Sequence, residues 1–582
     1  MKYKELVDTY IKIEETSKRL NKTGIIAELL KKTPEKDIPG VILLLQGRVF
    51  PLWDRRKLGI AAKLILKAIH LATGFSTEKI EESWRKTGDL GITAKKLVEK
   101  KKQSTLISVD LELSKVILNL AKLAEIEGNG SADRKIALVA ELLTSAKASE
   151  AQYIVRTVLE DLRVGAGNSS IRDAIVWAYA GKNLGIKNTS KEWIIESREE
   201  YNKYIEAVQE AYDITSDFSR IAGILRDEGY SGLKKISLEI GKPIKAMLVQ
   251  KADNIEAAFE KVGKPAVFEY KYDGFRLQIH KINNKVLLYT RSLEDVTTQF
   301  PDIVEIILKK VRAEHVILDS EAVGINRNTG KCMPFQSISQ RIRRKHDIEK
   351  IKNELPVEVN VFDLLYLNGE NMLKTPFLKR REKLNKIIRQ EPKALVLATQ
   401  IVTEKGKEAE EFYKSALQTG NEGVIAKNID SPYKPGSRVG FCVKIKPVMK
   451  SLELVIVAAE WGEGKRANWL TSFTLACKTE DGLKEIGKVG TGIKELKSEG
   501  TSFDELTELL RPFIIGQKAH MVKVSPKIVI EVSYEEIQSS PSYSSGYALR
   551  FPRFIRLRED RTPEDIDTLK TIEELYKTQK HR

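Results

Sequence analysis

The apolar residues of this chain change their spacing once, at about residue 240, and this change limits the folds open to it. Before that point they recur every three or four residues, as on one face of a helix, and strand-like alternation is scarce. Tyr3, Leu6, Val7, Tyr10 and Ile11 form the first such face. The N-terminal third of the chain is therefore predicted to be helical.

After residue 240 apolar and polar residues alternate, which is the pattern of β-strands with two different faces. Within residues 266–282, one face holds Phe275, Leu277 and Ile279, and the residues between them fall on the other. Further short strands are predicted, with helices between them, at residues 316–319, 357–362, 423–426 and 442–446. The middle of the chain is therefore predicted to be a mixed α+β domain.

Beyond Pro447 the predicted strands are short and closely spaced, which is typical of a small barrel or sandwich. They lie at residues 452–460, 473–478, 485–489 and 527–536. The fold class expected is a multidomain chain with an all-α domain, an α+β domain and an all-β domain. We place these domains at residues 1–215, 216–447 and 448–582.

The charge balance favours a polyanionic partner. Lysine and arginine number 98 against 81 acidic residues, a formal net charge of +17. Such an excess suits nucleic acid or a charged membrane face, and the alternative is a merely lysine-rich surface. The three cysteines, Cys332, Cys442 and Cys477, exclude a disulfide scaffold and a four-cysteine zinc site. With no apolar stretch long enough to span a membrane, we expect a cytoplasmic protein and no membrane partner.

One segment in the helical part carries two glycines between predicted helices. Residues 162–167 read LRVGAG, with Gly165 and Gly167 close to Arg163. Glycines let a backbone approach a phosphate and present bare N–H groups, whereas a helix C-cap needs a glycine for its own geometry. From the residues alone, a contact with a phosphate backbone and a helix C-cap are both possible interpretations of this segment.

Residues 269–276, EYKYDGFR, are the segment most informative about chemistry. Lys271 ends a predicted strand, a glycine turns the chain, and Arg276 returns on the next strand. Near other cations a buried lysine amine loses its proton more easily and becomes a nucleophile. Lys444 and Lys446, on one face of a later strand, would supply such cations. The alternative is a hairpin with surface charges.

Seven segments occur in the order of a known family's motifs. Residues 271–276, KYDGFR, resemble the KxDGxR signature of the covalent nucleotidyltransferases, which comprise DNA ligases, RNA ligases and mRNA capping enzymes. The other segments are residues 291–295 (RSLED), 318–321 (LDSE), 361–367 (VFDLLYL), 422–427 (EGVIAK), 434–446 (with KPGSR and KIK) and 549–561 (with LRFPRFIR and REDR). The sequences of these segments are most similar to those of the ATP-dependent replicative DNA ligases of archaea and eukaryotes.

The resemblance covers essentially the whole chain, since residues 162–167 are similar to the LRxGxG segment of the same enzymes. It implies a helical DNA-binding domain, an adenylation domain and an OB-fold that encircle the duplex. Two residues depart from the family's pattern. Cys442 stands where many relatives carry an aromatic residue, and Arg561 replaces the final lysine of the RxDK motif.

The implied reaction consists of three nucleotidyl transfers. Lys271 attacks the α-phosphate of ATP, the AMP moves to the 5′-phosphate of a nick in double-stranded DNA, and the 3′-hydroxyl then displaces AMP. Catalysis by positioning and charge neutralisation suits these steps. ATP and Mg²⁺ are therefore the expected cofactors, and nicked duplex DNA is the expected partner.

The resemblance also implies roles for individual residues. Glu269 would accept a hydrogen bond from the adenine amino group, Arg291 would contact the ribose, and Phe362 would stack on the base. Phosphate contacts are expected from Arg276, Arg438, Lys444 and Lys446. Oxygen ligands for Mg²⁺ are expected from Glu321, which also contacts ATP, and Glu422. Closure over the nucleotide is assigned to Arg558, Asp560 and Arg561, and DNA-backbone contact to Arg163, Gly165 and Gly167.

Competing classes differ in recognisable features. NAD-dependent ligases carry a four-cysteine zinc module, which three cysteines exclude. An RNA ligase or capping-type nucleotidyltransferase would not need the long helical region, and a non-catalytic DNA-binding scaffold would not need Lys271. The sequence does not decide between ATP, ADP and GTP or between Mg²⁺ and Mn²⁺. A sliding clamp is a further candidate partner, although the sequence does not locate its binding site. We expect a monomer.

Overall fold

The computed structural model describes residues 1–54, 56–101, 110–189, 192–326, 332–333, 335–344, 348–447, 450–462, 466, 468–518 and 520–580. By packing, the chain divides into two compact units. The larger holds Met1–Trp84, Leu90–Ala416 and Asn421–Ile445, and the smaller includes Lys446–Arg582. Among the described residues no helix is long and apolar enough to cross a membrane.

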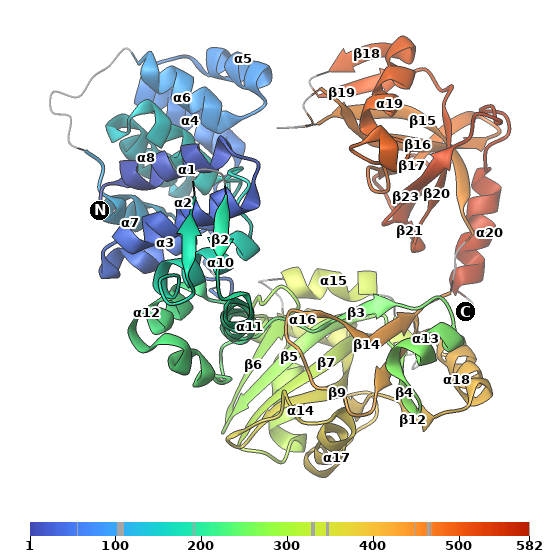
Figure 1. Ribbon diagram of the computed structural model, residues 1–582. Coiled ribbons are helices and arrows are strands. Elements are labelled where there is room, and N and C mark those ends of the chain that lie inside the picture. The colour runs from blue at the N-terminus through green and yellow to red at the C-terminus, as the bar shows by residue number, and fades with distance from the viewer. Residues whose placement is uncertain are drawn as a thin grey trace. The chain divides into compact units, whose positions relative to one another are not determined.

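The N-terminal region is helical, as predicted (Figure 1). Its helices are built on one hydrophobic core. Tyr3, Leu6, Val7 and Tyr10 are buried in it, while Ile11 is half-buried at its edge. The helices are α1 (Tyr3–Glu14), α2 (Arg19–Lys32), α3 (Ile38–Leu45), α4 (Ala62–Thr73), α5 (Thr77–Thr87), α6 (Leu90–Glu99), α7 (Leu113–Leu123), α8 (Ser131–Ser145), α9 (Ala148–Val158), α10 (Asn168–Tyr179), α11 (Arg198–Thr215) and α12 (Phe218–Lys234).

Two details of this region differ from an all-helical domain that ends at residue 215. A short antiparallel pair, β1 (Ile186–Asn188) and β2 (Trp193–Ile195), lies between α10 and α11. The next helix, α12, packs into the same core through Phe218, Ile221 and Leu225. Its apolar face thus joins it to the helices before it.

The central region contains two β-sheets, and the first is mostly antiparallel. Its strand order is β10-β9-β7-β5-β6, with β11 parallel to β9 and β8 paired with β7. Its strands are β5 (Phe275–Ile282), β6 (Lys285–Thr290), β7 (His315–Ile325), β8 (Cys332–Met333), β9 (Val357–Leu367), β10 (Glu370–Asn371) and β11 (Leu395–Leu397). Helices α14 (Pro301–Lys310), α15 (Phe335–Arg343) and α16 (Ile348–Glu354) accompany it. The predicted apolar face of β5 lies in its core.

The second sheet has the order β12-β4-β13-β14-β3. Its strands are β3 (Leu248–Lys251), β4 (Ala266–Lys271), β12 (Gln400–Thr403), β13 (Gly423–Asn428) and β14 (Arg438–Ile445). Helices α13 (Ile255–Val262) and α18 (Gly406–Gln418) share its core with Phe268, Val424 and Val443, while α17 (Phe377–Ile387) contacts β9. The opposite face of this sheet therefore carries the residues between these apolar ones.

The C-terminal region is built mainly of strands around one core. Its main sheet has the order β17-β16-β15-β19-β18, and β20 joins β15 to β23. The strands are β15 (Leu452–Trp461), β16 (Leu470–Thr479), β17 (Gly482–Val489), β18 (Ile514–Lys518), β19 (Met521–Val524), β20 (Val529–Ser533), β21 (Glu536–Ser539), β22 (Tyr547–Arg550) and β23 (Arg553–Leu557). Two helices, α19 (Phe503–Leu510) and α20 (Leu569–Lys580), accompany these strands.

Candidate active site

Lys271 stands where the chain passes from one sheet to the other. It is the last residue of β4 in the second sheet, and β5 of the first sheet begins at Phe275. The two strands are not paired, so the alternative of a simple hairpin with surface charges is wrong. The crossing instead places Lys271 at the edge of one sheet and Arg276 at the start of the other.

Gly274 allows this crossing to lie close to β7. A Cβ atom added there would lie 2.4 Å from the carbonyl oxygen of Ala322 and 3.1 Å from Cγ of Glu321. Backbone at that distance cannot be displaced easily, so a side chain at this position would push the loop away from the sheet. The glycine of the KxDG motif therefore keeps Lys271 and Glu321 close together.

Two carboxylates accompany Lys271. Its Nζ lies 2.5 Å from Oε2 of Glu422, and the backbone N–H of Glu422 donates to the Lys271 carbonyl at 2.8 Å. Burial raises the pKa of Glu321 to about 7, although the positive charges of Lys271 and Arg276 oppose the shift. In the structure the partner of Lys271 is thus an acid, whereas the sequence argument placed cations around it.

These acids have the chemistry of a magnesium site. In the described part of the chain, no group of three or more histidine, cysteine or acidic residues is arranged to hold a metal ion by itself. Mg²⁺ usually keeps several waters and binds through one or two carboxylates together with substrate phosphates. Glu321 and Glu422 therefore fit a hydrated Mg²⁺ that a nucleotide helps to hold.

Glu269 lies two residues before Lys271 on the same face of β4, and its side chain is only 3 % exposed. One oxygen pairs with Lys427 of β13, and the other lies 3.8 Å from Nη1 of Arg381 on α17. Phe362 of β9 lies next to this cluster, since Nζ of Lys427 is 5.2 Å from its ring centroid. Its ring is half-buried, which leaves surface for a stacked base.

Lys427 and Arg381 were not among the predicted site residues. Lys427 ends the EGVIAK segment, so its motif position was a usable signal. Arg381 lies outside every motif, and nothing in its sequence neighbourhood sets it apart from the adjacent Arg380. Only the packing of α17 against β9 brings it to Glu269.

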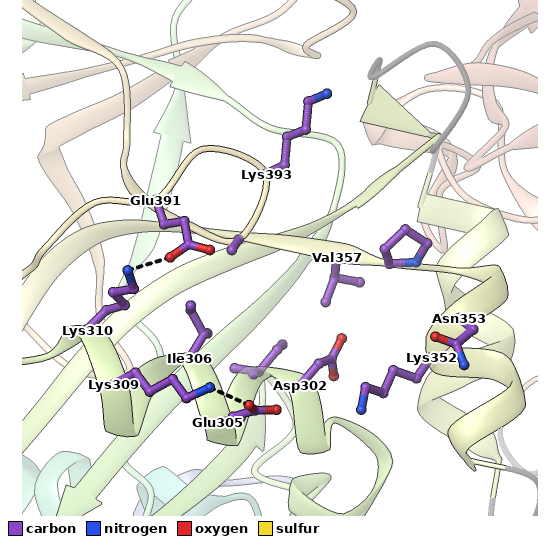
Figure 2. A pocket seen from close by; sticks show the side chains of 13 residues that line it. Asp302, Glu305, Ile306, Lys309, Lys310, Lys352, Asn353, Val357, Glu391 and Lys393 are labelled. Atoms are coloured by element: carbon purple, nitrogen blue, oxygen red, sulfur yellow. Dashed lines mark hydrogen bonds and ion pairs between the residues drawn. The ribbon is translucent and has the colours of Figure 1, made fainter.

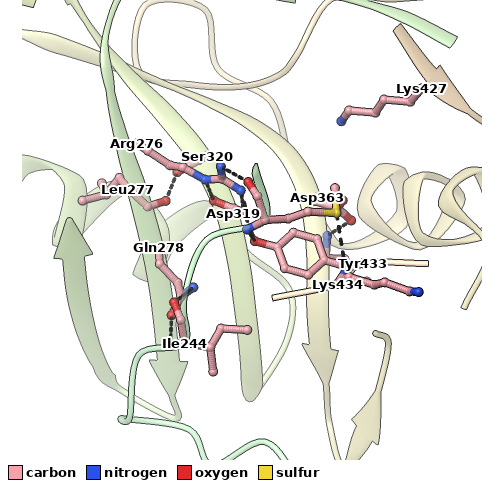
Figure 3. A network of polar contacts seen from close by, with 12 residues as sticks. Ile244, Arg276, Leu277, Gln278, Asp319, Ser320, Asp363, Lys427, Tyr433 and Lys434 are labelled. Atoms are coloured by element: carbon pink, nitrogen blue, oxygen red, sulfur yellow. Dashed lines mark hydrogen bonds and ion pairs between the residues drawn. The ribbon is translucent and has the colours of Figure 1, made fainter. Parts of the chain in front are cut away.

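Arg276 is held in a network of polar contacts (Figure 3). It donates to both oxygens of Asp319, to the Met247 carbonyl at 2.8 Å and to the Tyr433 hydroxyl at 3.1 Å. Tyr433 in turn donates to Asp319 at 2.6 Å. The Arg276 guanidinium therefore has a fixed position, and its centre lies 5.4 Å from the Phe362 ring.

The other predicted nucleotide contacts come from the ends of two strands and from the second sheet. Arg291 follows β6 and Arg438 begins β14, and both are exposed. Lys444 is opposite Ile425, which is itself opposite Glu269, so the three lie on one face of the second sheet. Lys446 follows the end of β14 and pairs with Glu535 at 3.0 Å in the smaller unit, so it does not share the strand face of Lys444.

Cys442, which departs from the family's pattern, is buried in a small core between the two sheets with Ile317, Leu365 and Tyr433. Burial raises the pKa of its thiol to about 12, so it stays protonated and acts as an apolar side chain.

A hollow of about 520 Å³ beside α14 is lined by none of the predicted site residues (Figure 2).

The C-terminal motif forms a cluster of its own. Nη2 of Arg558 lies 2.7 Å from Asp560, and its Nη1 contacts Glu453 of β15. Nε of Arg561 lies 3.3 Å from the same Glu453. The hydrogen bond from Arg558 lowers the pKa of Asp560 far below its ordinary value. All of these residues belong to the smaller unit.

The glycine-rich segment lies between α9 and α10. Gly165 has φ of +67° and Arg163 has φ of +56°, and Nζ of Lys22 donates to the Gly165 carbonyl at 2.9 Å. Gly167 is the N-cap of α10, and a Cβ atom there would meet nothing within 4 Å. The segment therefore caps the start of a helix, and the alternative of a helix C-cap is wrong.

Comparisons with known proteins agree along the whole chain. Three family models match: "DNA ligase N terminus" over residues 2–176, "ATP dependent DNA ligase domain" over 246–446 and "ATP dependent DNA ligase C terminal region" over 466–561. The DNA ligase of Nanoarchaeum equitans is 47% identical over 584 residues, which cover 100% of this chain and 99% of that protein. The DNA ligase of Thermococcus onnurineus is 42% identical over 581 residues, covering 100% and 98%.

A solved structure titled "Pmar-Lig_PreS3" has a TM-score of 0.55 and 16% identity, covers 95% of this chain and 99% of its own, and shares the fold. With that central family model matched over residues 246–446, the two sheets define a nucleotidyltransferase. Together with the three models and the full-length relatives, they show that the chain belongs to the ATP-dependent DNA ligases. It seals nicks in duplex DNA through a lysyl-AMP intermediate and uses ATP and Mg²⁺.

Proposed function

We propose that Lys271 is the lysine that carries AMP. The observation that supports this is its position at the end of β4, beside Glu422 and Glu321, where the chain crosses between the sheets. Nζ would leave Glu422, lose a proton and form a bond to the α-phosphorus of ATP, while the bond from that phosphorus to pyrophosphate breaks. AMP would then pass to the 5′-phosphate of the nick, and the 3′-hydroxyl would displace it.

The test is the Lys271→Ala variant, with Lys271→Arg as a partner that keeps the charge. Neither variant should form the protein–AMP adduct, measured as a mass shift after incubation with ATP and Mg²⁺. Both should still bind nicked duplex DNA and should still seal a nick whose 5′-phosphate already carries AMP, because that last step does not use the lysine. Covalent AMP on Lys271→Ala protein would overturn the proposal.

The arrangement of side chains on the two central sheets supports a set of proposed nucleotide contacts. Glu269 is proposed to accept a hydrogen bond from the adenine amino group, Phe362 to stack on the base, and Arg291 to hold the ribose. Arg438 and Lys444 are proposed to contact phosphates. Arg276, whose donors are engaged by Asp319 and its neighbours, would offer its charge from a fixed position.

Magnesium, when bound, supplies positive charge beside the reacting phosphates. Glu321 and Glu422 would hold it, since their oxygen atoms suit a hard cation. Glu422, whose carboxylate pairs with Lys271 in this structure, would then hold the metal through the same group.

The C-terminal region is proposed to be an OB-fold. β15 pairs with β20 through Leu452–Val455 and with β19 through Ala458–Glu460, with register shifts that bend it, while β16 follows its other edge. A parallel bridge between Thr491 and Arg553 brings the segment after β17 next to β23. One bent strand shared in this way is typical of a small barrel. On this barrel Arg558, Asp560, Arg561 and Lys446 are proposed to act when it closes over the nucleotide.

The helical region is proposed to bind the DNA backbone through Arg163, Gly165 and Gly167. Open space at Gly167 and the start of α10 support this, because helix N-termini attract phosphate. The domain bounds 1–215, 216–447 and 448–582 stay a prediction. The packing of α12 into the N-terminal core supports a first domain that also includes this helix. A monomeric state, an intracellular location and a sliding-clamp partner stay predictions, and no surface is assigned to the clamp.

A further inference from the structure

Three buried polar atoms near the base end of the proposed nucleotide site lack a hydrogen-bond partner within the described part of the chain. They are Oε1 of Glu269, Nη1 of Arg381 and Oε1 of Gln400. The side chains of Glu269 and Arg381 are 3% and 9% exposed, and the two atoms lie 3.8 Å apart. Gln400 of β12 is directly opposite Glu269 of β4, so both side chains emerge on the same face.

In each of the two charged side chains, one atom binds a neighbouring protein group and a second atom is left without a hydrogen-bond partner. Oε2 of Glu269 pairs with Lys427, and Nη2 of Arg381 donates to the Ala398 carbonyl at 2.6 Å. Burial lowers the pKa of the Arg381 guanidinium below its ordinary value. An unsatisfied buried hydrogen-bonding atom costs about 1–3 kcal/mol, and more when charged, so a ligand that satisfied both atoms would gain from them.

The free atoms are an acceptor and a donor side by side. Adenine presents the complementary pair, because its 6-amino group donates and the ring nitrogens on either side of it, N1 and N7, accept. Guanine carries an accepting oxygen at position 6, which would face the Glu269 carboxylate. A site that hydrogen-bonds a ligand rejects analogues that leave its buried groups unpaired.

We propose that Arg381 is a specificity-determining residue for the nucleotide, and that its Nη1 donates to the ring nitrogen next to the adenine amino group held by Glu269. Gln400 accepts from the second hydrogen of that amino group. The assignment rests on the proposed binding of adenine at Glu269. With N1 as the ring nitrogen, Arg381 adds to the selection against GTP, because N1 of guanine carries a hydrogen, whereas N7 accepts in both bases.

The experiment compares self-adenylation of the full-length enzyme with ATP, 1-deaza-ATP, 7-deaza-ATP and purine riboside triphosphate, each with Mg²⁺. The first two analogues lack one ring nitrogen each, and the last lacks the 6-amino group. Wild-type enzyme should react about 10- to 100-fold less efficiently with the deaza analogue that removes the Arg381 partner. Arg381→Met should react equally with ATP and that analogue, whereas Arg381→Gln, which keeps a donor, should restore part of the difference.

The purine riboside triphosphate separates this proposal from the one on which it rests. Arg381→Met should still prefer ATP to that compound, because Glu269 reads the amino group. Lys383→Met, on the same helix, should behave as wild type in every comparison. Equal use of ATP and both deaza analogues by the wild type would overturn the role of Arg381. The same holds if the rates of Arg381→Met with ATP and with both analogues fall by the same factor relative to wild type. If the wild type discriminates against the deaza analogue but uses ATP and purine riboside triphosphate equally, the role of Glu269 is refuted instead.

Discussion

Arg276 donates two hydrogen bonds to the carboxylate of Asp319, from Nε at 2.9 Å and from Nη2 at 2.5 Å. The Asp319 side chain is 1% exposed and that of Arg276 is 20% exposed. Two parallel hydrogen bonds between a guanidinium and a carboxylate fix both position and orientation. The charge that Arg276 brings to the site is therefore placed by β7, the strand that also carries Glu321.

The first prediction concerns this pair. Asp319→Asn leaves the Arg276 charge without its counter-charge, and breaking a buried pair in this way costs about 3–5 kcal/mol, less here because Arg276 is partly exposed. Tyr433→Phe removes one hydrogen bond from the same network and should cost about 1 kcal/mol. Urea denaturation should show the larger loss for Asp319→Asn, together with a raised KM for ATP. Equal losses in the two variants would contradict the assigned order.

The second prediction concerns Gly274. An alanine there would place its Cβ 2.4 Å from the Ala322 carbonyl oxygen, so the loop after Lys271 must move. Overpacking of this kind costs about 1–3 kcal/mol, and a shift of the nucleophile also slows chemistry. We expect Gly274→Ala to lose both stability and the rate of AMP adduct formation.

Gly223 of α12 is the matched control for that substitution. A Cβ atom there meets nothing within 4 Å, and the residue lies inside a helix. Gly223→Ala should leave adduct formation unchanged and should raise stability by up to about 1 kcal/mol, because alanine is the better helix former. A Gly274→Ala enzyme as active as this control would show that the close approach to β7 is unnecessary.

The third prediction concerns His280, which is fully buried on β5. Its Nδ1 accepts from the Gly241 N–H at 2.9 Å, and its Nε2 lies 2.9 Å from the Gln278 side-chain oxygen, so the neutral ring satisfies both contacts. Burial lowers its pKa to about 3. Below pH 6.5 the unfolded chain binds a proton that the folded one does not, so stability falls as pH drops from 6.5 toward 3.

The measurement is the urea midpoint of wild type and His280→Gln across that pH range. His280 contributes a slope of up to about 1.4 kcal/mol per pH unit, which the variant should lack. The difference between the two proteins should therefore shrink as the pH falls. Parallel curves would mean that His280 titrates in the folded chain as it does in the unfolded one.

Much of the strand content could be predicted from the sequence, because one-sided burial leaves an alternating pattern. Residues 316–319 and 357–362 fall inside β7 and β9, and the expected apolar face of β5 is buried. The opposite face of β5 is buried as well, since Gln278 and His280 lie under neighbouring segments. The apolar periodicity of β5 could not predict burial of this second face, because that burial depends on which distant segments pack against the strand.

Sheet membership was beyond the reach of the sequence for a similar reason. β4 and β5 follow each other closely, which favours a hairpin, yet they belong to different sheets. Partner choice depends on contacts with distant strands such as β13 and β7. The motif order identified most of the residues around Lys271, whereas Arg381 reaches Glu269 only through tertiary packing.

The last prediction concerns Arg558. This residue is 11% exposed and is held between Glu453 and Asp560 in the smaller unit, whereas Lys271 belongs to the larger one. If the proposed barrel closes over the nucleotide, Arg558 must exchange Glu453 for the departing pyrophosphate. An arginine placed there stabilises charge that develops only in the first transfer. Domain closure of this kind is a common gating step.

Arg558→Ala should therefore slow self-adenylation far more than it slows the sealing of a nick that already carries AMP. Single-turnover rates of the two reactions measure this directly. Arg556→Ala is the matched control, since Arg556 is 63% exposed and pairs with Glu531 on a neighbouring strand at 2.7 Å. It should leave self-adenylation close to the wild-type rate. Equal losses in both reactions for Arg558→Ala would assign that residue to folding or DNA binding, because neither role distinguishes the first transfer from the last.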